Sequence, residues 1–406
     1  MKKHWLTLHG NTFLWIKRGR GFIYNTDNKK KLIFSLSDKI EKICVHLLKT
    51  ENLYSIELPE EIIKDKEIHK WIDSILNIQA GTLSLNTTST NRSISLKPIL
   101  KIQDNKEYYE EQHKQGFKGK ILQNLHELTF YINGSKYGNN EYYKQSIFPI
   151  EKCSEINSSK IFTFIKNSRN LFLRNINLVG DIFSYPDFEK LLHYISSFSL
   201  EITIHIMIQD FLNYISKVKN IKWPSQIEFN VILNTMWDLT GLQTISFPFS
   251  FTVFVFSEND FIQFSNILKT LSTNINIRFI PLYNHTNRLF FESNIFLEKE
   301  DLEKMELSKN EIFIRQALNT TNFGKLTVLP NGNVYANVNE TPLGTLDESP
   351  YSIIYKEFTE GKSWLKVRDQ APCTSCIYQW MCPSPSNYEI ILEQPNLCHV
   401  KPYEYI

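Results

Sequence analysis

Four cysteines near the end of the chain have the residue type and the spacing of a metal or iron–sulfur site. A C-x2-C turn directs two thiolates at one centre, because its backbone amides point at the sulfurs and stabilise their charge. Four thiolates complete either a tetrahedral zinc site or a cubane cluster. The four follow the pattern C-x2-C-x5-C-x15-C and are Cys373, Cys376, Cys382 and Cys398.

The spacing favours a [4Fe–4S] cluster over zinc. Structural zinc sites more often use two close pairs, whereas here one close pair is followed by a looser third cysteine and a distant fourth. A set of buried free thiols or a disulfide is the plainer alternative, but the chain has only six cysteines and four of them crowd here. His399 is expected to be a surface residue, because neighbours in an extended chain point in opposite directions.

The composition excludes several classes of protein. A chain of 406 residues with 42% hydrophobic and 13% aromatic content is expected to form two or three folded domains. A net charge of +2 gives no reason to expect nucleic acid or an acidic membrane as a partner. No apolar run reaches the roughly eighteen residues of a membrane helix, and the start lacks the apolar core of a signal peptide. Thiols clustered in a chain without an export signal predict a reducing, cytoplasmic setting.

Residues 1–93 are expected to form a domain of their own. Short β-type runs separated by turn residues come first, and two amphipathic helices follow. Cys44 lies on the apolar face of the first helix and is expected to be core. This order predicts a winged-helix-like module. The expected elements are strands at Trp5–Leu8, Thr12–Ile16 and Gly21–Tyr24, a helix after Ser37 and a helix near Glu67–Asn77.

A second domain is expected over residues 94–320, after a polar linker within residues 82–118. Six nearly continuous apolar runs alternate with helical stretches, which indicates parallel strands buried on both faces. A partial (β/α)6-type barrel is the favoured α/β fold, and periodicity alone does not separate it from an open doubly wound sheet. The remaining residues, 321–406, are loop-rich and hold the cysteines. The six runs are Leu128–Ile132, Asn175–Val179, Ile202–Ile208, Ile227–Leu233, Phe251–Phe256 and Ile275–Ile280.

The cysteine-rich tail resembles the second half of a SPASM domain, the auxiliary-cluster module of peptide-modifying radical SAM enzymes. The resemblance implies that the four cysteines ligate one auxiliary [4Fe–4S] cluster. In that family a further cluster uses a cysteine four residues after the third one and another at the end of a G-x-V-Y-x-C strand. Those positions are Ser386 and Asn337 in this chain. The resemblance therefore implies that this chain retains one of the family's two auxiliary clusters and has lost the other.

The barrel segment resembles radical SAM enzymes but departs from them at the decisive motif. Those enzymes carry C-x3-C-x2-C in the loop after the first barrel strand, and no such triplet exists in this chain. The loop NGSKYGNNEYYKQSIFP after Leu128–Ile132 contains no cysteine. The strand that ends at Gly180-Asp181 resembles the place of the Gly-Gly-Glu motif, with the acid shifted and one glycine missing. Without the thiolates, SAM binding and catalytic residues are not expected.

The chain as a whole thus resembles a pseudo-radical SAM protein with a SPASM end, of the group that accompanies double-glycine peptide systems in Bacteroidales. The segments Trp380–Glu389 and Asn396–His399 look typical of that group. Residues 1–93 resemble a RiPP recognition element, in which a leader peptide adds a strand to a small sheet. The segment Phe22–Thr26 matches the pattern that closes its third strand. Alternatively, these strands only cap the barrel.

The resemblance implies a non-catalytic partner in the maturation of a ribosomally synthesised peptide. Such a protein would bind the precursor (leader) peptide, a catalytically active radical SAM maturase, or both, and hold one cluster. A zinc-stabilised peptide-binding protein is one alternative. A barrel enzyme with non-SAM chemistry at Glu292 or Asp181 is another. Basic residues such as Lys29–Lys31 are offset by Asp27 and Asp38, so neither nucleic acid nor a membrane is expected as a partner.

Overall fold

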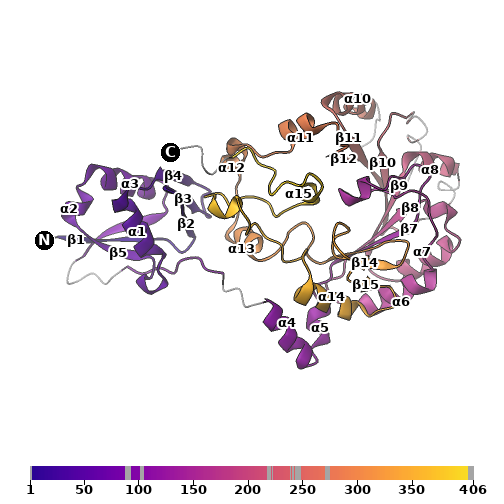
Figure 1. Ribbon diagram of the computed structural model, residues 1–406, viewed down its shortest axis with the longest axis horizontal. Helices are drawn as coiled ribbons and strands as arrows, with labels where there is room; N and C mark the ends of the chain where they lie inside the picture. The colour runs from indigo at the N-terminus through magenta and orange to yellow at the C-terminus, as the bar shows by residue number, and fades with distance from the viewer. Residues whose placement is uncertain are drawn as a thin grey trace.

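The computed structural model places the chain as an N-terminal unit, a large parallel sheet and a cysteine-bearing tail that lies between them (Figure 1). The expected linker and the connection after β10 fall in part outside the described residues. No helix in the described part of the chain is long and apolar enough to span a bilayer. The structure describes residues 2–86, 93–100, 105–216, 221, 223–237, 239, 242, 248–269 and 275–400.

The N-terminal unit contains two three-stranded antiparallel sheets, in the orders β5-β1-β6 and β2-β3-β4. The three expected strands are confirmed, and three more were not expected: β4, β5 and β6. Since β3 pairs with β2 on one side and β4 on the other, it is a central strand. The strands are β1 (Lys3–Leu8), β2 (Thr12–Lys17), β3 (Arg20–Asn25), β4 (Lys31–Ser35), β5 (Ser55–Pro59) and β6 (Gly81–Asn86).

The helices of this unit are α1 (Asp38–Leu48), α2 (Glu60–Ile63) and α3 (Lys66–Asn77). Both expected helices begin at capped positions. The Ser37 hydroxyl accepts the Ile40 amide at 3.4 Å, and the Asp65 carboxylate accepts the Glu67 amide at 3.0 Å. Their apolar stripes pack with β1 and β5 into one core, where Cys44 is fully buried as expected.

Six parallel strands follow, and they lie in the sheet in their sequence order, β7 to β12. A doubly wound sheet reverses its order near the middle, so the consecutive order favours the barrel-type alternative. On the other side of β7 the sheet continues with β13, which is parallel to β7, and then with β14 and β15. The six strands are β7 (Glu127–Gly134), β8 (Asn175–Gly180), β9 (Glu201–Met207), β10 (Ile227–Leu233), β11 (Phe249–Val255) and β12 (Asn276–Pro281).

One face of the parallel sheet is covered by helices. Alternate side chains of β7 to β11 pack there against the apolar stripes of the covering helices, and this is the largest core of the molecule. Trp364 from the tail is fully buried in the same core, and its indole nitrogen donates to the Lys325 carbonyl at 3.0 Å. The helices include α6 (Ser158–Ser168), α7 (Phe188–Ser196), α8 (Ile208–Asn213), α10 (Glu258–Lys269) and α14 (Pro350–Glu360).

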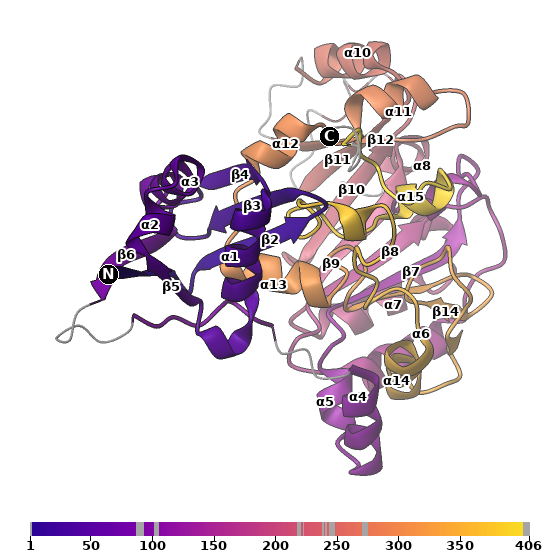
Figure 2. The same cartoon turned by 60° about the vertical axis from the view of Figure 1, so that its left-hand side comes forward.

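The tail joins the two larger parts. Phe22 and Tyr24 of β3 pack in one apolar cluster with Tyr378, Met381 and Cys382 of the cysteine-bearing loop. Figure 2 shows β2 and β3 beside α13 and the tail. The sheet β2-β3-β4 is therefore packed directly against the segment that carries the cysteines. The elements of this region are β13 (Lys325–Val328), β14 (Asn333–Tyr335), β15 (Gly344–Thr345), α11 (Arg288–Asn294), α12 (Lys299–Lys304), α13 (Lys309–Ala317) and α15 (Asn387–Ile391).

Candidate functional site

The structure brings all four predicted cysteines to the wall of a single small cavity of about 20 Å³. Two of them, Cys373 and Cys382, are buried, and the other two are partly buried. The two remaining cysteines of the chain are elsewhere, with Cys44 in the N-terminal core and Cys153 exposed. Residues 25 positions apart in sequence thus converge on one volume. The four that line it are Cys373, Cys376, Cys382 and Cys398.

A single turn of 3-10 helix sets the first pair. Cys373–Ser375 forms the turn, and the amide of Cys376 donates to the carbonyl of Cys373 at 2.9 Å. The chain then reverses again, where the amide of Cys382 donates to the carbonyl of Tyr378 at 3.1 Å. These two turns direct three sulfurs to the cavity from one short loop.

The fourth cysteine is held by a separate part of the chain. Cys398 forms an isolated parallel bridge with Leu297, just before α12. The Leu297 amide donates to the carbonyl of Leu397 at 3.0 Å, and the His399 amide donates to the carbonyl of Leu297 at 3.0 Å. Backbone pairing with Leu297, and not another turn, therefore brings the distant Cys398 to the other three cysteines.

Burial controls the protonation of these thiols. It raises the pKa of Cys376 to about 11, and it also raises the pKa of Cys382 and of Cys398. Arg368 offsets part of the shift at Cys382. Thiols of this kind are neutral at pH 7 and lose their protons only to a bound metal, since a metal ligand must be the thiolate.

Positive charge and amide protons surround the sulfurs. The guanidinium of Arg368 lies 4.0 Å from Cys373 Sγ and is held by Glu389 at 2.7 Å. The amide of Val400 lies 3.2 Å from Cys398 Sγ, and Cys376 accepts from the amide of Tyr378. Such donors stabilise the negative charge of coordinating thiolates and orient them.

The four cysteines form an all-sulfur donor set, which suits either a tetrahedral zinc ion or a cubane iron–sulfur cluster. Zinc binds sulfur at about 2.3 Å, which brings four thiolates to roughly 3.8 Å of one another. Within the described part of the chain, no three His, Cys, Asp or Glu side chains are placed to hold one metal ion. A cubane places each thiolate on a different iron, so its sulfurs stand farther apart around a central volume.

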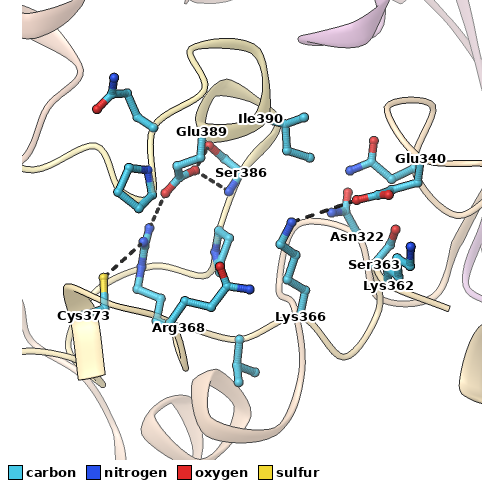
Figure 3. A pocket seen from close by; sticks show the side chains of 16 residues that line it. Asn322, Glu340, Lys362, Ser363, Lys366, Arg368, Cys373, Ser386, Glu389 and Ile390 are labelled. Atoms are coloured by element: carbon cyan, nitrogen blue, oxygen red, sulfur yellow. Dashed lines mark hydrogen bonds and ion pairs between the residues drawn. The ribbon is translucent and has the colours of Figure 1, made fainter. Parts of the chain in front are cut away.

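A second pocket, of about 120 Å³, adjoins the cysteine cavity and shares Arg368 and Cys373 with it (Figure 3). Asn337 and Ser386, the two positions that depart from the cysteine pattern, both line this pocket. Asn337 donates to the side chain of Asn387 at 2.8 Å, and the Ser386 hydroxyl donates to Glu389 at 2.5 Å. Each of the two side chains therefore makes a hydrogen bond to a residue of α15 at the position where the family pattern has a cysteine.

The loop after β7, residues 135–157, fills the end of the sheet at which chemistry is expected in such folds. Phe148 is fully buried there against Met207, Ile232 and Phe254, residues of three neighbouring strands. The loop is longer than the sequence indicated and includes one cysteine, Cys153, which is exposed. The segment NGSKYGNNEYYKQSIFP itself contains no cysteine, and Cys153 lies four residues beyond its end. One cysteine in this loop does not form the C-x3-C-x2-C motif.

Two buried carboxylates lie at the ends of adjacent strands. Asp181 follows β8, and Asp210 lies on α8 directly after β9, where it accepts a hydrogen bond from Ser135 after β7. Burial, with a contribution from Asp181, raises the pKa of Asp210 to about 6. Sequence analysis missed Asp210, because its proximity to Asp181 comes from the parallel register of the strands.

A row of buried polar side chains crosses the sheet face away from the helices. Asn177 donates to Thr129 at 3.1 Å, His205 lies 3.1 Å from Asn177, and Asn230 donates to Ser250 at 3.2 Å. Burial lowers the pKa of His205 to about 4, so the imidazole is neutral at pH 7. The expected description of these strands as nearly continuously apolar overlooked the alternate polar positions.

The other candidates are explained by local structure. Glu292 pairs with Arg288 at 2.7 Å, one helical turn away on α11. Asn287 donates to the carbonyls of Phe256 and Leu282 and so stabilises the turn before α11. His399 donates to the carbonyl of Glu292 at 2.7 Å and is half-exposed, as expected of a surface histidine.

Comparison with known proteins adds a distant similarity. The sequence matches no family model and no curated protein. The solved structure of Streptococcus suis SuiB bound to S-adenosylmethionine is similar with a TM-score of 0.41 and 12% identity, over 98% of this chain and 100% of SuiB. SuiB bound to the precursor peptide SuiA gives a TM-score of 0.41 and 13% identity, over 100% of both chains. Both TM-scores are low.

Proposed function

We propose that this chain is a non-catalytic, pseudo-radical SAM partner in the maturation of a ribosomally synthesised peptide, with a SPASM-like tail that holds one [4Fe–4S] cluster. The observation that carries the proposal is the contrast between the cysteine-bearing tail and the loop after β7. Four cysteines line one cavity in the tail, whereas the loop after the first strand of the parallel sheet has the single Cys153. Reductive cleavage of SAM needs three thiolates that leave one iron free.

The tail residues would hold the cluster in defined roles. The four cysteines would bind its irons, and Arg368 and the amide of Val400 would balance its negative charge. When bound, a [4Fe–4S] cluster supplies single-electron transfer. The segments around Trp380–Glu389 support assignment to the group that accompanies double-glycine peptides in Bacteroidales. The proposed units are residues 1–93, 94–320 and 321–406.

The packed strand ends support a silent barrel. An open mouth is needed for a small-molecule substrate, and here the loop after β7 inserts Phe148 between side chains of three strands. The winged-helix-like unit at residues 1–93 would provide the binding function in its place. Its partner would be the precursor peptide or an active maturase, and a cytoplasmic setting follows from the need for reduced thiols.

Incubation of the anaerobically reconstituted protein with SAM and dithionite tests the silent-barrel proposal. No 5′-deoxyadenosine above the level of a protein-free control is expected. Formation of 5′-deoxyadenosine that depends on the chain and survives a Cys153→Ser substitution overturns the proposal, because the barrel would then activate SAM without its usual thiolates. A Cys376→Ser variant serves as the control for chemistry at the tail.

A barrel enzyme of another class is the second candidate, favoured by the carboxylate pair Asp181 and Asp210. A buried acid with a pKa near neutrality is typical of a general acid or base. Substrate turnover that is lost in both Asp181→Asn and Asp210→Asn, with the fold intact, would establish that reading. Zinc in place of the cluster would instead make the tail purely structural.

A further inference from the structure

Side-chain oxygens without a hydrogen-bond donor gather at the carboxyl ends of three neighbouring strands of the parallel sheet. Asn133 belongs to β7, Asp181 follows β8, and Gln209 follows β9. The three residues are buried, with exposed fractions of 1%, 9% and 6%. Among the described residues, no donor reaches Oδ1 of Asn133, Oδ1 of Asp181 or Oε1 of Gln209. Buried acceptors are normally satisfied, so their concentration at one end of the sheet calls for a positive partner.

The backbone that presents Asp181 is fixed by β7. The amide of Asp181 donates to the carbonyl of Gly134 at 2.9 Å, and the side-chain nitrogen of Asn133 donates to the carbonyl of Asp181 at 2.8 Å. Gly180 permits this approach, because it has a φ of +133° and a Cβ there would lie 2.5 Å from Oδ1 of Asn133. Main-chain contacts therefore hold Asp181 at the sheet, while Oδ1 of its carboxylate has no donor among the described residues.

Asp210 reaches the same place from α8. It is 4% exposed and accepts a hydrogen bond from the hydroxyl of Ser135. Ser135 directly follows Gly134, whose carbonyl accepts the amide of Asp181. The two acids therefore converge on one short segment at the end of β7, although they are 29 positions apart in the sequence.

The charge of this pair is poorly balanced by the protein. Burial raises the pKa of Asp210 to about 6, and the charge of Asp181 adds to the rise. Lys136 and Lys152 oppose it, but both are exposed. Tyr214 lies close to both acids, since their charges add to the rise that burial causes in its pKa. Above pH 6 or so Asp210 is ionised beside Asp181, and buried charge is stable only when it is paired.

We propose that Asp181 and Asp210 together bind one hard divalent cation, such as Mg²⁺ or Mn²⁺, at the carboxyl ends of β8 and β9. Carboxylates are ligands that these ions prefer, and Mg²⁺ is commonly held by one or two of them with water in its other positions. The two negative charges balance the charge of the ion. Within the described residues no third His, Cys, Asp or Glu joins the pair, so a closed zinc-type site is not formed.

Ser135 is assigned a positioning role at this site. Its hydroxyl donates to Asp210, and its oxygen accepts the amide of Tyr137 at 3.0 Å, so the group is engaged both as donor and as acceptor. A cation at the two carboxylates would join the segment after β8 to α8 and neutralise the buried charge. The site uses none of the four cysteines of the tail, and the inference goes beyond the proposed function.

Titration of Mn²⁺ into the cluster-reconstituted chain tests the proposal, with free Mn²⁺ measured by its EPR signal. Asp181→Asn and Asp210→Asn are the test variants, because asparagine keeps the shape of the side chain and removes its charge. Asp187→Asn is the matched control. Both oxygens of Asp187 already have partners, Ser158 at 2.7 Å and Lys190 at 2.9 Å. Circular dichroism checks that each variant is folded.

Wild type and Asp187→Asn are expected to bind about one Mn²⁺ per chain, displaced by Mg²⁺, with affinity lower by about tenfold or more in each test variant. Mn²⁺ should also raise the unfolding temperature of wild type, because only the folded chain assembles the site. With EDTA present, Asp210→Asn should instead unfold at a higher temperature than wild type, because its unpaired charge is gone. A wild-type chain that binds no Mn²⁺, or equal binding by all four chains, overturns the proposal.

Discussion

At the scale of single residues, the cysteine site is held in a state that favours metal uptake over disulfide formation. Burial raises the pKa of Cys376 to about 11, so the attacking thiolate of a disulfide exchange is scarce at pH 7. A bound metal centre displaces these protons and forms bonds to all four sulfurs. Nearby Arg368, itself paired with Glu389, supplies positive charge without becoming a ligand.

Replacement of a single ligand tests this account of the thiols. Cys376→Ser and Cys398→Ser are each expected to lose most of the iron that the wild-type chain retains after reconstitution and desalting, because serine is a poor ligand for the cluster. Cys153→Ser is the matched control, since Cys153 is exposed and lies outside the cavity. Equal iron in all variants would contradict the assignment.

Asp210 provides a test by stability. The pKa of its carboxyl rises from the ordinary 3.8 to about 6, mainly through burial. The unfolded chain therefore ionises first, and the folded state loses stability as pH rises from about 4 to about 6, then stays lowered. Asp210→Asn removes this loss and keeps an acceptor for Ser135.

The variant Asp210→Asn is expected to gain about 1–3 kcal/mol of unfolding free energy at pH 7.5 and to gain nothing near pH 3.5. Urea unfolding at the two pH values measures the difference. Asp187→Asn is the control of opposite sign, since its partners Ser158 and Lys190 lower the pKa of Asp187. A gain that is equal at both pH values would show that the ionised carboxylate is not the cause.

At the scale of elements, the loop after β7 is a packed part of the sheet and not a mobile lid. Phe148 contacts Phe254 edge-on, with ring centroids 5.2 Å apart, and Tyr142 lies against both Phe148 and Phe256. Gly138 permits the close return of this loop, because a Cβ there would lie 1.9 Å from the carbonyl oxygen of Ile150. The strand ends are thereby covered by the chain itself.

Phe148→Ala is expected to lower the free energy of unfolding by about 3–5 kcal/mol, the usual range for a large buried aromatic. Phe261→Ala, at a residue on α10 that is 47% exposed, is the control and is expected to have a much smaller effect. Thermal and denaturant unfolding both measure this difference. A similar small effect in both variants would mean that the loop opens readily and that the strand ends are accessible.

The sequence predicted the long regular elements and the cysteine set, and missed what depends on pairing. The sequence predicts β7 to β12 and the helices α1 and α3, because apolar runs, helical spacing of apolar residues and the Ser37 cap are local signals. The strand β5 was missed, since five residues with Pro59 at the end resemble a loop until β1 pairs with them.

At the scale of the whole molecule, the cysteine site lies where the N-terminal unit is attached. Phe22 contacts Tyr378 with ring centroids 5.3 Å apart, and Tyr378 lies in the sequence between two proposed ligands, Cys376 and Cys382. The hydroxyl of Tyr24 donates to the carbonyl of Leu307 at 2.8 Å from the same face. A metal centre that fixes this loop would therefore also fix the N-terminal unit, which is proposed to bind peptide.

Removal of the metal should loosen that attachment. Ferricyanide with a chelator is expected to raise amide hydrogen exchange in β2 and β3 and in residues 376–382, because the loop between the ligands loses its anchor. Strands β9 and β10, at the centre of the parallel sheet, are the internal control and should stay protected. Unchanged exchange in β2 and β3 would show that the apolar contacts alone hold the unit.

Iron and acid-labile sulfide analysis of the anaerobically reconstituted chain tests the central claim most directly. The account predicts about four irons and about four sulfides per chain, with the absorption of a [4Fe–4S] cluster, because four cysteines surround one cavity. Cys44 and Cys153 lie outside that cavity, so a second cluster is not expected. A chain that takes up one zinc ion and no sulfide would contradict the account.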